Sequence, residues 1–258
     1  MLQYAVSKPL VALVLQGGKR VTTGSRTFDF GAGDSLLITT DVPTVSQITA
    51  ASRVLPYYSL VLELDPTIIA DLASQVGLLP FDADQPVQVD PTEAEVADAA
   101  LRLLRLLDRP GTLAVLGPQL SRELHYWLLT GRHGGAIRAL GVTDSYAERV
   151  ARAVAVLRNH YAEPIKVEAL AEAAGMSLSA FHVHFRGITS LSPLQFQKQL
   201  RLIEARRRML AQGEAISDAA YGVGYESVPQ FTREYRRMFG QPPARDVRQA
   251  RAQMSFAA

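Results

Sequence analysis

The sequence contains no cysteine, and only one tryptophan and five histidines occur among its 258 residues. Without cysteine, disulfides, thiolate metal sites and a cysteine nucleophile are all excluded. No apolar run reaches the roughly 18 residues of a membrane span, and Met1 is not followed by a basic and apolar leader of the secretory type. We therefore expect a globular protein of the cytoplasm that needs no cofactor.

Hydrophobic residues make up 48% of the chain, which is enough for packed cores, and its length exceeds the typical size of about 100 to 200 residues for one domain. The net charge of +2 conceals an asymmetry on the two sides of Thr143. Residues 1–142 hold 11 basic and 14 acidic side chains, a net −3, whereas residues 143–258 hold 16 and 11, a net +5. The second part is thus the candidate for binding a polyanion.

Short apolar or alternating runs separated by glycine-rich turns occupy the first 64 residues, which is typical of antiparallel strands. After Asp65 the apolar spacing changes to three and four, which predicts helices, with Asp65 and Asp90 as N-caps. The expected strands are Leu10–Leu15, Ser35–Ile38, Val45–Ile48 and Tyr58–Leu64, and the expected helices are Thr67–Gln75, Glu93–Leu107 and Gly117–Leu129.

A glycine cluster at the end of this half, Gly131 to Gly135, predicts a helix stop and a flexible connection. We place the domain boundary between Gly134 and Asp144. The predicted fold class is α+β with two domains. A small β-barrel or sheet followed by helices spans residues 1–138, and an all-α domain spans residues 144–250.

The second half is predicted to consist almost entirely of helices, in which one arrangement occurs twice. A short helix, a turn glycine and a second helix are followed by a long linking helix and then by the same unit again. A helix-turn-helix that reads DNA needs a small residue in its first helix and favours glycine in its sharp turn. The predicted helices are Ser145–Tyr161, Lys166–Ala174, Leu178–Gly187, Pro193–Gln212, Ile216–Val223 and Val228–Phe239.

Both copies satisfy this requirement. The first contains Ala171 and Gly175, the second Ala220 and Gly224, and the two glycines are 49 residues apart. In each copy two aromatic residues follow at a spacing of four, which places them on one face of the second helix. These aromatic pairs are Phe181 with Phe185, and Phe231 with Tyr235.

These features resemble the AraC/XylS family of transcription regulators over roughly residues 145 to 250. The most specific segments are Ile216–Ser227, Gln230–Arg233 and Phe239–Pro243. The first half is similar to the amino-terminal domain of one AraC-type subgroup. That similarity is carried by Leu15–Arg20, Gly33–Leu37 and Leu62–Pro66.

The resemblance implies a sequence-specific DNA-binding regulator whose amino-terminal domain senses a small effector or dimerises. The partners it implies are double-stranded operator or promoter DNA, a small-molecule effector, a second copy of the chain and RNA polymerase. It transfers no effector-binding residue to a position of this sequence. The operator, the effector and the sign of regulation stay open.

With the aromatic faces turned inward, the opposite faces of the two recognition helices should lie in the major groove. In the first helix, Ser179 and His182 can bind base edges, Val183 can contact a thymine methyl, and Arg186 can reach a phosphate. In the second, Gln230 suits adenine, and Arg233 suits guanine or a phosphate. The DNA-contacting residues that we predict are Ser179, His182, Val183, Arg186, Ser227, Val228, Gln230, Arg233 and Arg237.

An enzyme and a protein-binding adaptor are the two alternatives to a DNA-binding regulator. An enzyme built on the barrel is disfavoured, because the first histidine, His125, comes after the strands and no nucleophile elbow or phosphate loop occurs. His182 and His184 cannot share a metal ion, because side chains two residues apart on a helix point in directions that differ by about 200°. An adaptor that binds another protein through its double helical unit remains the alternative to a DNA-binding regulator.

Overall fold

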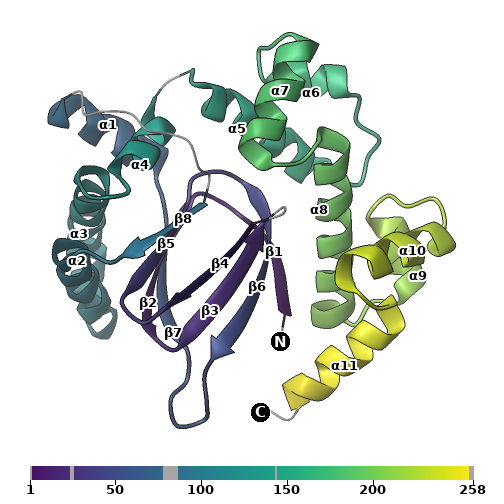
Figure 1. Ribbon diagram of the computed structural model, residues 1–258, viewed down its shortest axis with the longest axis horizontal. Coiled ribbons are helices and arrows are strands. Elements are labelled where there is room, and N and C mark those ends of the chain that lie inside the picture. Colours follow the sequence, from purple (N-terminus) through teal and green to yellow (C-terminus); the bar gives the residue numbers. More distant parts are fainter. Residues whose placement is uncertain (1, 24–25, 78–86, 143, 256–258) are drawn as a thin grey trace.

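The computed structural model describes residues 2–23, 26–77, 87–142 and 144–255. Two four-stranded antiparallel sheets, ordered β1-β6-β3-β4 and β7-β2-β5-β8, face each other in the first half of the chain (Figure 1). The strands are β1 (Leu2–Ser7), β2 (Leu10–Gln16), β3 (Gly18–Thr23), β4 (Arg26–Gly31), β5 (Asp34–Ile38), β6 (Val42–Ala50), β7 (Tyr58–Glu63) and β8 (Val87–Pro91).

Strand β2 is buried on both faces, which accounts for its continuous apolar sequence. Successive side chains of a strand point to opposite faces, so Val11 and Leu13 pack against helices while Ala12 and Val14 face the other sheet. The space between the sheets is filled by a cluster of buried side chains. Its members are Ala12, Val14, Val21, Phe30, Leu36, Ile38, Val42 and Val87.

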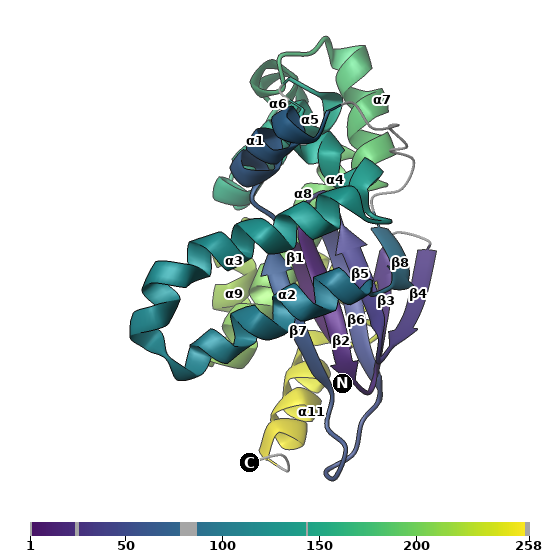
Figure 2. The same ribbon diagram turned by 90° about the vertical axis from the view of Figure 1, so that its left-hand side faces the viewer.

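Helices cover the outer face of the second sheet, in front of the strands in Figure 2. Asp65 caps the first of these helices as predicted, because its carboxylate accepts hydrogen bonds from the backbone N–H groups of Thr67 and Ile68. The elements are α1 (Pro66–Val76), α2 (Ala94–Arg105), η1 (Leu106–Asp108), α3 (Pro110–Thr130) and α4 (Gly134–Gly141).

The rest of the described chain is helical. Of its helices, η2 is a π-helix that continues α8, and α11 lies beyond the helices predicted from the sequence. The elements are α5 (Tyr146–Asn159), α6 (Val167–Ala173), α7 (Leu178–Thr189), α8 (Pro193–Arg207), η2 (Arg208–Gln212), α9 (Ile216–Gly222), α10 (Val228–Phe239) and α11 (Pro243–Ser255).

The predicted α+β fold class is confirmed, with differences in detail. Asp90 is not an N-cap: it lies in β8, and Glu93 precedes α2. Gly134 does not belong to a flexible connection but begins α4, where a Cβ would overlap the carbonyl oxygen of Leu129. Within the predicted boundary, Thr143 lies outside the described residues. Strands β1, β3, β4 and β8 were not predicted.

The strands and the carboxy-terminal helices are in direct contact. Helix α8 runs beside β1 and β6 (Figure 1), and Val6 of β1 packs against the apolar core between α5, α6 and α7. Arg158 of α5 forms a partly buried ion pair with Asp41, just before β6. Burial of Asp41 raises its pKa, although Arg158 opposes that shift.

No helix within the described ranges has the length and apolar character needed to span a membrane.

Candidate DNA-reading surface

The first helix-turn-helix consists of α6 and α7. Gly175 makes the turn with φ of 62°, a left-handed conformation that glycine adopts without strain. The hydroxyl of Ser177 caps α7 by accepting a hydrogen bond from the N–H of Ala180 at 3.3 Å. Phe181 and Phe185 are fully buried, with their ring centroids 5.2 Å apart. The opposite face of α7 is therefore the one directed to solvent.

That solvent-facing side carries the predicted contacts of the first unit. Ser179, His182, Val183 and Arg186 are all exposed, and 69% of the surface of Val183 is accessible. Leu178, the first residue of α7, is 41% exposed.

The two histidines of α7 diverge as their spacing requires. The ring of His184 stacks on Tyr146 of α5, with centroids 3.6 Å apart and planes inclined by 11°. His182 is exposed on another side of the helix. His182 is consequently the histidine of this helix that is presented with Ser179 and Val183.

The second unit, α9 and α10, repeats the arrangement. Gly224 has φ of 87°, and a Cβ at this position would overlap the carbonyl oxygen of Ala162, in the loop between α5 and α6. Ser227 caps α10 by accepting from the N–H of Gln230 at 3.3 Å. Phe231 and Tyr235 are fully buried. The turn glycine thus serves both the local bend and a close contact with the loop that precedes the first unit.

On α10 the structure separates the predicted DNA contacts into two groups. Gln230, Arg233 and Arg237 are exposed, and Pro229 occupies the first turn, where its missing N–H costs little. Ser227 and Val228 are half-buried, and Val228 packs against the apolar core of the second unit. The exposed polar surface of this helix is therefore narrower than the sequence suggested.

A buried polar cluster, which sequence reasoning did not identify, supports α10 from behind. The Tyr235 hydroxyl donates to Asp246 Oδ2 at 2.7 Å, and Arg206 Nε donates to the same oxygen at 2.7 Å. Burial alone would raise the pKa of Asp246, but hydrogen bonds from Arg206 and Tyr235 hold it below its ordinary value. Burial and Asp246 together raise the pKa of the Tyr235 hydroxyl.

The three consecutive arginines of the linking helix are engaged within the protein. Arg206 is buried against Asp246, whereas Arg207 and Arg208 both pair with Glu204. Arg208 also donates to the hydroxyl of Tyr161 at 2.9 Å. These arginines therefore bind the linking helix to α11 and to the α5–α6 loop.

Arg201 of α8 links the loop before the first unit to the turn of the second unit through backbone carbonyls. Its Nε donates to the carbonyl of Tyr161 at 2.6 Å, and Nη1 donates to that of Gly224 at 2.9 Å. Nη2 donates to the carbonyls of Ala162 and Glu163 at 3.3 and 3.0 Å. One side chain thus connects the α5–α6 loop with the turn of the second unit.

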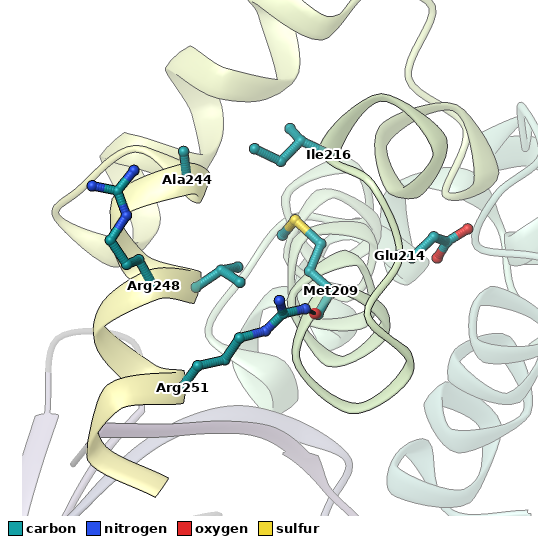
Figure 3. Close-up of a pocket in the computed structure, with 7 residues that line it drawn as sticks. Met209, Glu214, Ile216, Ala244, Arg248 and Arg251 are labelled. Atoms are coloured by element: carbon teal, nitrogen blue, oxygen red, sulfur yellow. Dashed lines mark hydrogen bonds between the residues drawn. The ribbon is translucent and has the colours of Figure 1, made fainter. Parts of the chain in front are cut away.

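A pocket of about 360 Å³ lies between η2, α9 and α11 (Figure 3). Met209 and Ile216 lie at its apolar part, and Arg251 reaches over from α11 to donate to the carbonyl of Met209 at 2.9 Å. None of the predicted DNA-contacting residues lines this pocket. The residues around it hold α11 against the end of the linking helix.

Comparison with known proteins relates both halves of the chain to one family. A family profile described as the AraC-type transcriptional regulator N-terminus matches residues 1–136, and a profile described as a helix-turn-helix domain matches residues 170–249. The chain belongs to the AraC-type family of transcriptional regulators. The family resemblance seen in the sequence is thereby confirmed, and this AraC-type protein is a DNA-binding transcription regulator.

Two relatives and one solved structure illustrate the similarity. The HTH-type transcriptional activator RhaS of Citrobacter koseri is 34% identical over 201 residues, which cover 74% of this chain and 68% of the relative. RhaS of Salmonella arizonae is 30% identical over 195 residues with the same coverage. The structure of ToxT from Vibrio cholerae with a bound unsaturated fatty acid has a TM-score of 0.62, 10% sequence identity, and coverage of 95% of this chain and 89% of ToxT. At that identity, ToxT shares the fold.

Proposed function

We propose that this AraC-type regulator reads an operator through α7 and α10 together, each lying in a major-groove segment on one face of the same duplex. The observation that carries the proposal is the repeated geometry of the two units. In each, a capped helix buries two aromatic rings and exposes its opposite side, which carries polar groups. Adjacent major-groove segments lie about 34 Å apart, and α8 together with η2, residues 193–212, would span about 30 Å at about 1.5 Å per residue.

The residues proposed to contact DNA fall into two roles. Ser179, His182 and Gln230 have side chains suited to base edges, whereas Arg186 and Arg237 are suited to phosphates. Arg233 can serve in either role, Val183 can contact a thymine methyl, and Ser227 and Val228 lie at the start of α10 beside the groove.

Selection from a random-sequence duplex library tests this proposal. The selected duplex should be bound more tightly than a scrambled one, with an affinity that falls as salt rises, and footprinting should show two protected groove segments per monomer. Protection of one segment per monomer would contradict the two-unit arrangement. Absence of salt-dependent affinity for any duplex would favour the adaptor alternative.

We also propose that the regulator activates transcription, as the RhaS relatives do by name, and that RNA polymerase is a partner of the DNA-bound form. The AraC-type profile over residues 1–136 supports a regulatory rather than a catalytic role for the sheets. The same proposal divides the chain into domains at residues 1–138 and 144–250. It also includes a homodimer that acts in the cytoplasm. If the protein activates transcription, reporter expression from a regulated promoter should decrease when the gene for this protein is deleted.

The amino-terminal part is proposed to bind a small, mainly apolar effector, a role supported by the AraC-type profile and by the fatty acid bound to ToxT. The space between the sheets is filled, so we place the effector in a pocket of about 510 Å³ between the ends of the strands and α5, where charged side chains would bind a polar group of an otherwise apolar molecule. Lys8, Asp41 and Arg158 line it beside Leu64. Thermal shift against organic acids, aldehydes and aromatics tests this role, and no shift with any of them would contradict it.

A further inference from the structure

Glu234 lies beside the proposed base-reading residue Gln230, on the same helix and at the spacing of four that brings side chains together. Its carboxylate accepts three hydrogen bonds, from the linking helix α8, from the α9–α10 turn and from α10 itself. Lys198 Nζ of α8 donates to Oε1 at 3.0 Å, and the Tyr225 hydroxyl, in the α9–α10 turn, donates to Oε2 at 2.9 Å. Gln230 Nε2 donates to Oε1 at 3.4 Å.

This carboxylate is held in its charged form. The side chain of Glu234 is 20% exposed, and burial alone would raise its pKa, yet the hydrogen bonds from Lys198, Tyr225 and Gln230 place the pKa below its ordinary value. A negative charge on a helix that approaches phosphates repels DNA, because like charges repel. The position of Glu234 therefore weakens the general attraction of α10 for any duplex.

The same carboxylate restricts the orientation of the Gln230 amide. An amide carries a donor on one side and an acceptor on the other, and either side can face a base when the amide is free to flip. Because Glu234 can only accept, it keeps Nε2 of Gln230 turned toward itself and leaves Oε1 turned away. An outward acceptor suits the exocyclic amine of adenine or cytosine and is repelled by the acceptor oxygens of guanine and thymine.

Lys198 is the second group that Glu234 controls. Its side chain is 55% exposed, and its ammonium group forms an ion pair with Glu234. An ion pair neutralises the lysine for long-range attraction, although a pair this exposed is weak enough to open. Removing the carboxylate would release one positive charge close to Arg237, across the shallow cleft of α8 and α10 that all three side chains line.

From these contacts we propose that Glu234 is a positioning residue that sets specificity: it fixes the Gln230 amide for a base with an exocyclic amine and lowers non-specific affinity by neutralising Lys198. This inference rests on the proposed reading of DNA by α10. Base discrimination and affinity for any duplex should therefore change in opposite directions when Glu234 is replaced. Loss of the carboxylate should reduce discrimination between bases while it increases attraction to any duplex.

The test compares wild type with Glu234→Gln in the full chain, using a duplex selected by the wild type from a random-sequence library and a scrambled duplex. For Glu234→Gln we expect tighter binding to the scrambled duplex, a log-log salt slope steeper by about one, and a loss on the order of tenfold in the ratio of the two affinities. Selection repeated with the variant should lose the preference for adenine or cytosine at one operator position.

Glu226→Gln is the matched control. Glu226 is exposed in the turn before α10, and the substitution changes the net charge equally without altering the Glu234 contacts. It should leave base preference unchanged. In the double variant Gln230→Ala with Glu234→Gln, base preference at that position should equal that of Gln230→Ala alone, because Glu234 acts through Gln230.

The outcomes are distinct. Equal losses of affinity for both duplexes would show that Glu234 merely supports the fold and would overturn the proposal, as would unchanged affinities and base preference. A Glu226→Gln variant with the same loss of discrimination would also overturn it. If the wild type selects no sequence from the library, the proposed function itself is wrong. That result is obtained with the wild type alone and is therefore distinct from every result obtained with the variants.

Discussion

The ring of Tyr4, in the first strand, meets the ring of Phe239, the last residue of α10, edge to face at a centroid distance of 4.4 Å and an angle of 82°. The guanidinium of Arg206 lies 5.2 Å from the centre of the Tyr4 ring and 5.7 Å from that of Phe239. A residue of the amino-terminal sheet is therefore part of the apolar core behind the second reading helix.

Replacing Tyr4 with alanine should lower the free energy of unfolding by about 2 to 3 kcal/mol, because the aromatic pair and the cation–π contact are both lost. Urea denaturation measures the change. Tyr4→Phe keeps the ring and should be within about 0.5 kcal/mol of wild type. Equal destabilisation by the two variants would show that the hydroxyl, rather than the ring, matters at this interface.

The two turn glycines should respond differently to alanine. Gly175→Ala adds backbone strain alone, since the nearest atom to its new Cβ would be a flexible Arg149 nitrogen at 3.6 Å, and we expect a cost of about 1 kcal/mol. Gly224→Ala adds an overlap with the carbonyl of Ala162 and should cost at least about 3 kcal/mol. Urea titration of both variants provides the comparison, and similar losses would argue against the close contact at Gly224.

Arg233 should distinguish base reading from phosphate binding. It is exposed on α10, and Arg233→Ala should cost about 1 to 3 kcal/mol at one operator position if the guanidinium binds a guanine. If it holds a phosphate, affinity should fall evenly for all duplexes and the salt slope should decrease by about one. Gel-shift titration at two salt concentrations separates these results. Unchanged affinity, specificity and salt dependence would remove Arg233 from the interface.

His133 should make stability depend on pH. Its ring is buried beside Ser35, with Nε2 2.9 Å from the serine hydroxyl, and burial lowers its pKa although Asp90 and Glu93 oppose the shift. The unfolded chain then binds a proton more readily than the folded chain. The free energy of unfolding should fall as pH decreases through about 6.5, toward the lower folded pKa, by at most about 1.4 kcal/mol per pH unit.

Urea denaturation between about pH 8 and pH 5 measures this dependence. His133→Gln removes the titrating group and should flatten the curve in that range relative to wild type. An identical pH dependence in the variant would assign the effect to other groups.

The second half of the fold was largely predictable because its signals are local. The turns at Gly175 and Gly224 and the inward aromatic pairs each follow from neighbouring residues. The strands were harder. In β3 and β4, residues such as Arg20 and Asp29 form a cross-strand pair that is exposed, so no apolar alternation marks them.

The supporting contacts of the reading surface could not be read from the sequence, because they join residues far apart in the chain. Arg206 pairs with Asp246 across 40 positions, and Lys198 reaches Glu234 across 36. Exposed positions of α7 could be assigned from helical period alone. Val228 could not, because whether the first turn of α10 faces the core depends on how α10 packs against α9.

The guanidinium of Arg201 has a mechanical consequence. It donates to four carbonyl groups, those of Tyr161, Ala162 and Glu163 in the α5–α6 loop and that of Gly224, and so links the loop before the first unit to the turn of the second. Lysine has three donors on a single nitrogen and could not reproduce that planar set. In the complex proposed above, a duplex with an extra base pair between the two contacted segments would have to change its own twist. The main-chain oxygens bound by Arg201 would then help to set the spacing of the operator.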